Sequence, residues 1–413
     1  MIKRKYFEIV EKELNNKQIT ALIGSRQVGK TTLLENIYEK NKEISIFLTL
    51  DNVEVLNLFE NELEIFIKRY IEPYNIIFID EIQYSKNSGK NLKYIYDKYK
   101  KKIYVSGSST PEMAINSLQY LVGRVNIIEI KPISFEEFVR YKRKEDLFLL
   151  EDIKKQSNLK LLDLLFEEFL KFGSYPLILT LKNQKEKEKE LTNLVNTYLL
   201  KEIKEILNFR NLFDFEKLLK RFALSDGGIT NKSSFSSELE INRVKFNEMY
   251  STLINTYILN QVQPYYSNKI KELIKSSKIY FSDLGFKNSL IKNFNDLELR
   301  QDKGEIYESF ILSELKKENF DVFFWNYENR FEVDFCVEKN DNLIGFEIKS
   351  NLSSDNLPDS VKKFIDLQNP KEIYIFNNKI DSIREYNGVK IIFTNYINIV
   401  PIMKYLKKKY GFI

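Results

Sequence analysis

Five short apolar runs alternate with segments of helical spacing in the first third of the chain. They cover residues 19–23, 45–51, 75–79, 102–106 and 126–130. Near-continuous apolar runs of this length are typical of parallel strands that are buried on both faces. An amphipathic helix is expected within residues 1–18, because Phe7, Val10 and Leu14 recur at helical spacing. The pattern predicts an α/β fold in which helices cover a parallel sheet.

The pattern changes beyond residue 138, and residues 139–214 are expected to be largely helical. Further along, three helices are expected and then an extended segment, at 215–224, 233–239, 244–254 and 258–266. This order is typical of a winged-helix or helix-turn-helix unit, which can place a helix in a DNA groove. The third helix carries Arg243, Lys245 and Asn247 among acidic and apolar residues, not on a dense basic face. Packing or a protein contact is therefore favoured over DNA binding for this unit.

A loop of phosphate-binding composition follows the first apolar run. Residues 24–31 read Gly-Ser-Arg-Gln-Val-Gly-Lys-Thr, and a segment of helical spacing follows. Gly24 and Gly29 allow the backbone to turn its N–H groups around a polyphosphate, and the next helix adds the positive end of its dipole. We expect Lys30 to reach the β- and γ-phosphates and the Thr31 hydroxyl to hold Mg²⁺. The predicted nucleotide-binding residues are Gly24, Ser25, Arg26, Gln27, Val28, Gly29, Lys30, Thr31 and Thr32.

An acidic pair, Asp80 and Glu81, follows the third apolar run. In an open parallel sheet the carboxyl ends of the strands border the ligand, so both carboxylates are expected beside the phosphate loop. Asp80 would then hold Mg²⁺ through its water shell. Glu81 would polarise the attacking water.

Two further residues are candidates for contacts to the γ-phosphate. The fourth run leads into a Ser-Gly-Ser-Ser segment, where Ser108 is preferred over Ser106 and Ser109, with a plain Ser-Gly turn as the alternative. Arg124 precedes the fifth run and is a candidate sensor of the γ-phosphate, within the subunit or across a subunit boundary. The alternative for Arg124 is a surface salt bridge.

These motifs occur in an order that resembles the AAA-superfamily ATP-binding proteins of bacteria and archaea. The order is Gly-Ser-Arg-Gln-Val-Gly-Lys-Thr-Thr, Ile-Asp-Glu-Ile-Gln, Ser-Gly-Ser-Ser, Leu-Val-Gly-Arg and, at residues 132–138, Pro-Ile-Ser-Phe-Glu-Glu-Phe. The resemblance covers nearly the whole chain and implies ATP binding and hydrolysis, with ATP and Mg²⁺ as cofactors. It also implies a C-terminal domain of unknown function, which in this family often has a restriction-endonuclease-like core.

A second group of charged residues lies beyond residue 304. A helix expected over 305–317 carries Glu308, and strands expected over 331–335 and 343–349 carry Asp334, Glu347 and Lys349. Residues two apart on a strand share a face, so Glu347 and Lys349 are expected to project together. Asp334 and Glu347 would bind Mg²⁺ with Glu308 in support, and Lys349 would help to activate water. The set resembles the PD-(D/E)xK signature of restriction-endonuclease-like cores; the alternative is a retained fold without turnover.

The resemblance and the patterns together divide the chain into four predicted regions. Residues 1–138 form an AAA-type P-loop ATPase domain, 139–214 a helical connection, 215–300 a winged-helix-like region and 301–413 a nuclease-like α/β domain.

Composition excludes several other kinds of chemistry. The 413 residues include no histidine, which rules out imidazole zinc sites and catalysis by Ser-His or Cys-His pairs. The single cysteine, Cys336, rules out an intrachain disulfide and fits a reducing compartment. No apolar run approaches the roughly 18 residues of a membrane span, so we expect a cytoplasmic protein with no membrane partner.

Two functions of different classes are consistent with these motifs. In the first, ATP hydrolysis controls DNA handling by the C-terminal site. In the second, the chain is a nucleotide-gated switch that binds a protein partner and cuts nothing. The net charge of +5 is short of a strong nucleic-acid footprint. The sequence leaves DNA, a protein partner and a homo-oligomer all open.

Overall fold

The computed structural model of the chain describes residues 2–107, 119–143, 156–198, 213–266 and 276–412. It divides into two compact units. The first comprises Met1–Ile133 with Asn255–Ile258, and the second comprises Ser134–Ile254 with Leu259–Ile413. The predicted boundaries at residues 138, 214 and 300 therefore all lie inside the second unit. Among the described helices, none has the length and apolar composition that crossing a membrane requires.

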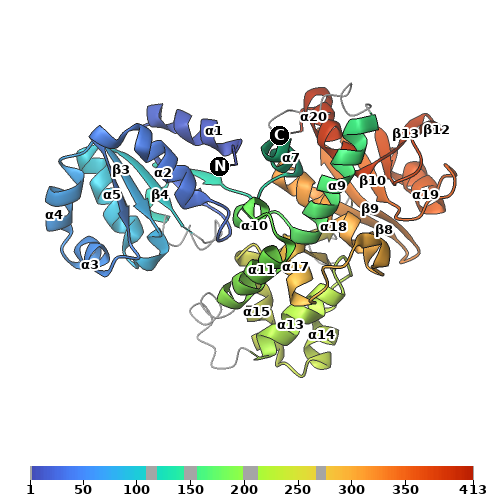
Figure 1. The fold of residues 1–413 in the computed structure, drawn as a ribbon, viewed down its shortest axis with the longest axis horizontal. Coiled ribbons are helices and arrows are strands. Elements are labelled where there is room, and N and C mark those ends of the chain that lie inside the picture. The colour runs from blue at the N-terminus through green and yellow to red at the C-terminus, as the bar shows by residue number, and fades with distance from the viewer. Residues whose placement is uncertain (1, 108–118, 144–155, 199–212, 267–275, 413) are drawn as a thin grey trace. The chain divides into compact units, whose positions relative to one another are not determined.

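The first unit is built on a five-stranded sheet with the strand order β2-β3-β4-β1-β5. All neighbouring strands are parallel, as the apolar runs predict. The strands are β1 (Ile19–Ile23), β2 (Ser45–Thr49), β3 (Ile76–Asp80), β4 (Lys102–Ser106) and β5 (Val125–Glu129), drawn in blue to cyan in Figure 1. The main helices are α1 (Tyr6–Lys12), α2 (Lys30–Lys40), α3 (Val53–Asn61), α4 (Leu63–Phe66) and α5 (Ser88–Tyr99).

Each strand contributes side chains to two separate apolar cores, one on each face of the sheet. Leu22 and Phe78 pack with Val10 and Leu34 from α1 and α2. Their neighbours along the strands pack in a second core with residues of α3 and α5, among them Ala21, Ile77, Ile79, Phe59 and Leu92. Burial on both faces explains why these strands read as continuous apolar runs, not alternating ones.

The second unit contains an eight-stranded mixed sheet with the order β12-β13-β11-β10-β9-β8-β6-β7. Its strands are β6 (Leu259–Pro264), β7 (Lys278–Phe281), β8 (Val322–Tyr327), β9 (Phe331–Lys339), β10 (Asn342–Ile348), β11 (Glu372–Phe376), β12 (Ser382–Tyr386) and β13 (Val389–Thr394). Strand β9 pairs antiparallel with both β8 and β10, and β10 then pairs with β11 in parallel.

Helices of the second unit come from before, between and after these strands. The helical segments predicted before the sheet are α7 (Phe135–Arg143), α9 (Gln156–Phe172), α10 (Pro176–Thr180) and α11 (Gln184–Tyr198). The three predicted helices of the middle region are α13 (Phe213–Leu224), α14 (Lys232–Glu238) and α15 (Arg243–Asn255). The remaining helices are α17 (Leu284–Leu290), α18 (Lys303–Lys317), α19 (Asp359–Gln368) and α20 (Ile399–Tyr410), drawn in orange to red in Figure 1.

The extended segment predicted over residues 258–266 does not stand alone after the three helices. It forms β6, which pairs antiparallel with β7 and parallel with β8. Strand β8 in turn pairs with β9, the strand that carries Asp334. The three-helix segment is therefore joined through β6 and β7 to the sheet that carries the candidate nuclease-like residues.

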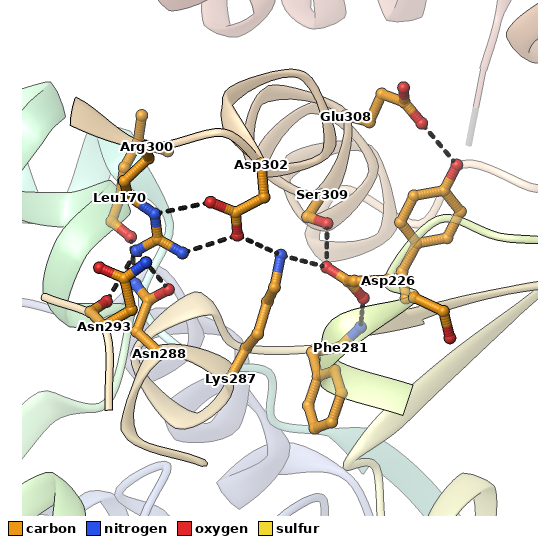
Figure 2. A network of polar contacts seen from close by, with 12 residues as sticks. Leu170, Asp226, Phe281, Lys287, Asn288, Asn293, Arg300, Asp302, Glu308 and Ser309 are labelled. Atoms are coloured by element: carbon orange, nitrogen blue, oxygen red, sulfur yellow. Dashed lines mark hydrogen bonds and ion pairs between the residues drawn. The ribbon is translucent and has the colours of Figure 1, made fainter. Parts of the chain in front are cut away.

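A buried polar network joins α17, α18 and the turn after α13 (Figure 2). The Lys287 ammonium lies 3.2 Å from Asp226 Oδ2 and 3.3 Å from Asp302 Oδ2. Arg300 forms two hydrogen bonds to the Asp302 carboxylate, and a third guanidinium hydrogen bond goes to the Asn288 side chain. The two bases and two acids balance one another, so their charges are compensated inside the protein.

We predict that Asp226→Ala destabilises the second unit by about 3–5 kcal/mol, because it removes one of the two carboxylates beside the buried Lys287. Trp325, the single tryptophan of the chain, is buried in this unit, so its fluorescence during urea unfolding reports on it. Asp321→Ala, at an exposed position of the same unit, is the control and should leave the midpoint unchanged. Equal midpoints for both variants would mean that the network contributes little.

Candidate functional site

The loop after β1 has the backbone geometry of a phosphate cradle. Gly24, Gln27 and Gly29 have positive φ angles of 141°, 59° and 94°. A Cβ atom on Gly24 would lie 2.2 Å from the Ile130 carbonyl oxygen, so only glycine fits there. The loop then enters α2, whose first residue is Lys30. A helix N-terminus with inward N–H groups attracts anions.

Lys30 is buried and lies across this loop. Its ammonium group donates hydrogen bonds to the carbonyl oxygens of Gly24 at 2.9 Å and Ser25 at 2.8 Å. Arg4, which the motif does not include, donates to the carbonyl oxygen of Val28 at 2.7 Å and to that of Lys131. Two cationic side chains therefore hold the loop in its conformation: Lys30 of the motif and Arg4 of the N-terminal segment.

Asp80, at the end of β3, connects the loop to two other elements. The Thr31 hydroxyl donates to Asp80 Oδ2 at 2.7 Å, and the Ser106 hydroxyl donates to Asp80 Oδ1. A carboxylate between two hydroxyl groups presents hard oxygen ligands of the kind that Mg²⁺ prefers. The residues present therefore fit a magnesium ion. Ser108, the serine that the sequence favours for this role, lies outside the described residues. Among the described residues, Ser106 at the end of β4 contacts Asp80.

Glu81 follows Asp80 in a left-handed backbone conformation, with a φ angle of 56°. Such a conformation is uncommon for a residue other than glycine. Its carboxylate accepts a hydrogen bond from the Gln83 side chain. The turn places Glu81 directly beyond the strand end that carries Asp80.

Arg124 does not lie with these residues. It precedes β5, and its carbonyl oxygen accepts from the N–H of Ile19, the first residue of β1. The phosphate loop begins at the opposite end of β1, about 16 Å away for a strand of five residues. The Arg124 guanidinium pairs with Asp97 at 2.7 Å, the surface salt bridge considered as its alternative. The geometry therefore does not support contact with a γ-phosphate of the same subunit, and the role across a subunit boundary stays a prediction.

The structure brings Asp334, within β9, together with Glu347 and Lys349 at the C-terminal end of β10. Asp334 Oδ2 accepts from the N–H of Ile348 at 2.7 Å, and the N–H of Asp334 donates to Glu347 Oε2 at 3.4 Å. The Lys349 ammonium lies 2.7 Å from Glu347 Oε1. Glu347 is buried, whereas the Lys349 side chain is 37% exposed, so this group borders the surface at its lysine.

Glu308 lies near this group, on α18. Tyr280 of β7 donates its hydroxyl to Glu308 Oε2 at 3.0 Å. Burial, together with the charge of Asp334, raises the pKa of Glu308 to about 8. Burial and the Asp334 charge likewise raise the pKa of Glu347 to about 8. Burial also raises the pKa of Asp334, against the opposing effect of Lys278.

These raised pKa values come first from burial of the carboxylates and, for Glu308 and Glu347, also from the nearby charge of Asp334. Among the described residues, no group of three or more carboxylate or cysteine side chains is arranged to hold a metal ion. Asp334 and Glu347 form a pair. One or two protein carboxylates fit magnesium sites whose remaining ligands are water or phosphate oxygens.

Comparison with known families gives an independent view of the first site. Residues 16–139 match the model of a family described as an AAA domain. This region therefore has the fold of a P-loop domain of the AAA type. The match, the parallel sheet and the loop geometry together support a P-loop ATPase. Residues 163–297 and 303–405 each match a family described as a domain of unknown function, so neither match tests a nuclease activity.

Two similar proteins are both described as uncharacterized. One protein of Methanocaldococcus jannaschii is 26% identical over 352 residues, which cover 79% of this chain and 74% of the relative. A second protein of that organism is 27% identical, over 68% of this chain and 65% of its own length. The Holliday junction branch migration motor RuvB of Thermotoga maritima is 16% identical, with a TM-score of 0.34 over 66% of this chain and 95% of RuvB. At this TM-score the likeness carries no argument about function.

We predict that Gly24→Ala weakens binding of a fluorescent ATP analogue at least about tenfold, because its Cβ would lie 2.2 Å from the Ile130 carbonyl oxygen and displace the loop. Gly123→Ala is the control, since Gly123 also has a positive φ angle but no heavy atom within 4 Å of its Cβ position. Similar affinities for both variants would show that the loop tolerates the displacement.

Proposed function

We propose that the first unit hydrolyses ATP to ADP and phosphate with Mg²⁺. We further propose that its nucleotide state controls the carboxylate site of the second unit, in DNA handling. The observation that carries the first part is the hydrogen bond between Thr31 and Asp80. It joins the residue after the loop lysine to the acidic end of β3, at the carboxyl edge of the sheet, where open parallel sheets bind their ligands.

Each residue of this site has a role that its position supports. The buried Lys30 exchanges its carbonyl partners for the β- and γ-phosphates, and the loop N–H groups bind the remaining phosphate oxygens. Mg²⁺ held by Thr31 and Asp80 would neutralise charge on the phosphates. Glu81, oriented by Gln83, accepts a hydrogen bond from the attacking water and aligns it.

For the second unit we propose metal-dependent cleavage of a phosphodiester. Asp334 and Glu347 would hold Mg²⁺, and the ion would polarise the phosphate. Lys349 lies on the exposed side of the pair, where it can contact a phosphate oxygen or steady developing charge. Glu308 supports the pair from α18. The excess of buried carboxylates, which raises the pKa of Glu347 and Glu308 to about 8, supports a site that binds a cation.

One observation favours the second candidate function, the nucleotide-gated protein switch. The described residues contain no preformed cluster of three metal ligands, and Lys349 already pairs with Glu347. A nuclease-like fold that only binds a partner would need no metal.

We predict that Lys30→Ala abolishes phosphate release from ATP and weakens ATP binding. Glu81→Gln should keep ATP binding but lower turnover by about 100-fold, since a water-orienting carboxylate contributes at least that much. Phosphate release is measured with and without DNA at a fixed low salt concentration, because phosphate contacts are salt-dependent. Lys42→Ala is the control, because the Lys42 side chain is 62% exposed. Full turnover by Glu81→Gln would contradict the role of Glu81.

We also predict Mg²⁺- or Mn²⁺-dependent cleavage of plasmid or oligonucleotide DNA that Asp334→Asn abolishes, because it removes one carboxylate of the pair. Asp321→Asn, at an exposed position, should cleave like wild type. Measuring DNA cleavage by Lys30→Ala, in which Asp334, Glu347 and Lys349 are unchanged, then tests whether nucleotide state controls cleavage. Substrates that remain intact with every metal would leave the switch as the function.

A further inference from the structure

Two segments that no sequence motif singles out lie against Glu308. The first is β7, whose Tyr280 donates its hydroxyl to Glu308 Oε2 at 3.0 Å. The second is the turn between α13 and α14. A Cβ atom on Gly227 would lie 3.0 Å from the Tyr280 ring and 3.3 Å from Glu308 Oε2. This turn therefore lies beside both Tyr280 and the Glu308 carboxylate to which Tyr280 donates its hydrogen bond.

The turn is fixed to β7 and to α18 at the same time. The N–H of Gly227 donates to the Ile279 carbonyl oxygen at 2.8 Å. Asp226 accepts from the N–H of Phe281 at 2.7 Å and from the hydroxyl of Ser309 at 2.7 Å. Ser309 directly follows Glu308 on α18, and Figure 2 shows Asp226 between Ser309 and Lys287. Movement of the turn would therefore move the residue next to Glu308.

We propose that Tyr280 and the turn at Asp226–Gly227 position Glu308 for the carboxylate site, so that the three-helix segment forms part of that site. Tyr280 is a positioning residue in this arrangement. Its hydroxyl fixes one carboxylate oxygen, and the turn closes the space into which Glu308 would otherwise rotate. The proposal rests on the proposed metal-binding role of Asp334 and Glu347.

The arrangement has a physical rationale. A carboxylate that supports a metal site must be held in one orientation, and outer hydrogen bonds of this kind commonly contribute 10–100-fold in metal affinity. Glu308 lies on a helix, whereas Asp334 and Glu347 lie on strands, so the strand ladder does not fix its side chain. The contacts from β7 and the turn supply that constraint.

The test is binding of Mn²⁺ to the full chain without nucleotide, by isothermal titration calorimetry. Tyr280→Phe should weaken Mn²⁺ binding roughly tenfold. Tyr265→Phe is the matched control, since Tyr265 also donates its hydroxyl to a glutamate, Glu338, at 2.9 Å. The unfolding midpoint from Trp325 fluorescence shows whether each variant is folded.

Gly227→Ala tests the turn itself. It should also weaken Mn²⁺ binding roughly tenfold, because the added methyl group pushes on Tyr280 and Glu308. Gly388→Ala is matched to it, since φ is 77° at Gly388 and 81° at Gly227, and nothing lies within 4 Å of the Gly388 Cβ position. Equal strain in the two variants isolates the effect of the contact.

A double variant separates positioning from general stability. If Tyr280 acts through Glu308, Tyr280→Phe should change Mn²⁺ binding no further in a Glu308→Gln background. Independent losses in the double variant would overturn the proposal, as would wild-type affinity in Tyr280→Phe while Asp334→Asn has lost binding. If wild type binds no Mn²⁺ that Asp334→Asn removes, the proposed metal site itself fails and this inference fails with it.

Discussion

A carboxylate buried away from water needs hydrogen bonds or a cation beside it. Within each unit, this constraint determines how helices, strands and turns pack against one another. Without such partners the cost is several kcal/mol per charge. Asp80 finds the hydroxyls of Thr31 and Ser106, which fixes α2 and β4 relative to β3. Asp226 finds Ser309 and Lys287, which fixes a turn against α18 and α17. The positions of the candidate sites follow from these partnerships.

The two buried charge groups of the second unit differ in their balance. Asp226 and Asp302 are matched by Lys287 and Arg300, so that network needs nothing further. Among the described side chains around Asp334, the carboxylates of Glu308, Glu332 and Glu347 outnumber the two lysines, of which Lys278 pairs with Glu332 and Lys349 with Glu347. A group with surplus negative charge favours a proton or a metal ion, whereas a balanced group favours rigidity. Buried acidic and basic side chains thus stabilise the fold around Asp226, and the same kinds of side chain suit cation binding around Asp334.

Local pattern was sufficient to predict the strands of the first unit. The bounds of β1 and β4 coincide with their apolar runs, because a strand that is buried on both faces needs apolar residues along its whole length. The phosphate loop could also be predicted from the sequence, since its glycines and Lys30 lie close together along the chain. Contacts between segments that are distant in the sequence could not be predicted in this way. Ser106 meets Asp80 only through the pairing of β3 with β4, and Arg4 reaches Val28 only because the N-terminal segment folds back onto the loop.

In the second unit the readable part was the set Asp334, Glu347 and Lys349, because strand periodicity places their side chains. The residues that contact Glu308 could not be predicted from the sequence, for a physical reason. Strand β7 has four residues, all buried, and its Tyr280 resembles any apolar strand residue until the sheet order is known. Its place beside β6 depends on pairing between strands separated by residues 265–277, which no local pattern specifies.

The position of Arg124 restricts the symmetry of any assembly that uses it. It lies at the amino edge of the parallel sheet, and the phosphate loop lies at the carboxyl edge. For one copy to place Arg124 at the loop of another, unlike edges of the two sheets must meet. When the contact is made in one direction only it is heterologous, so it repeats from copy to copy until it closes into a ring or extends as a filament. A two-fold dimer can provide it only if the two sheets lie side by side with their strands antiparallel, so that each Arg124 reaches the partner's loop.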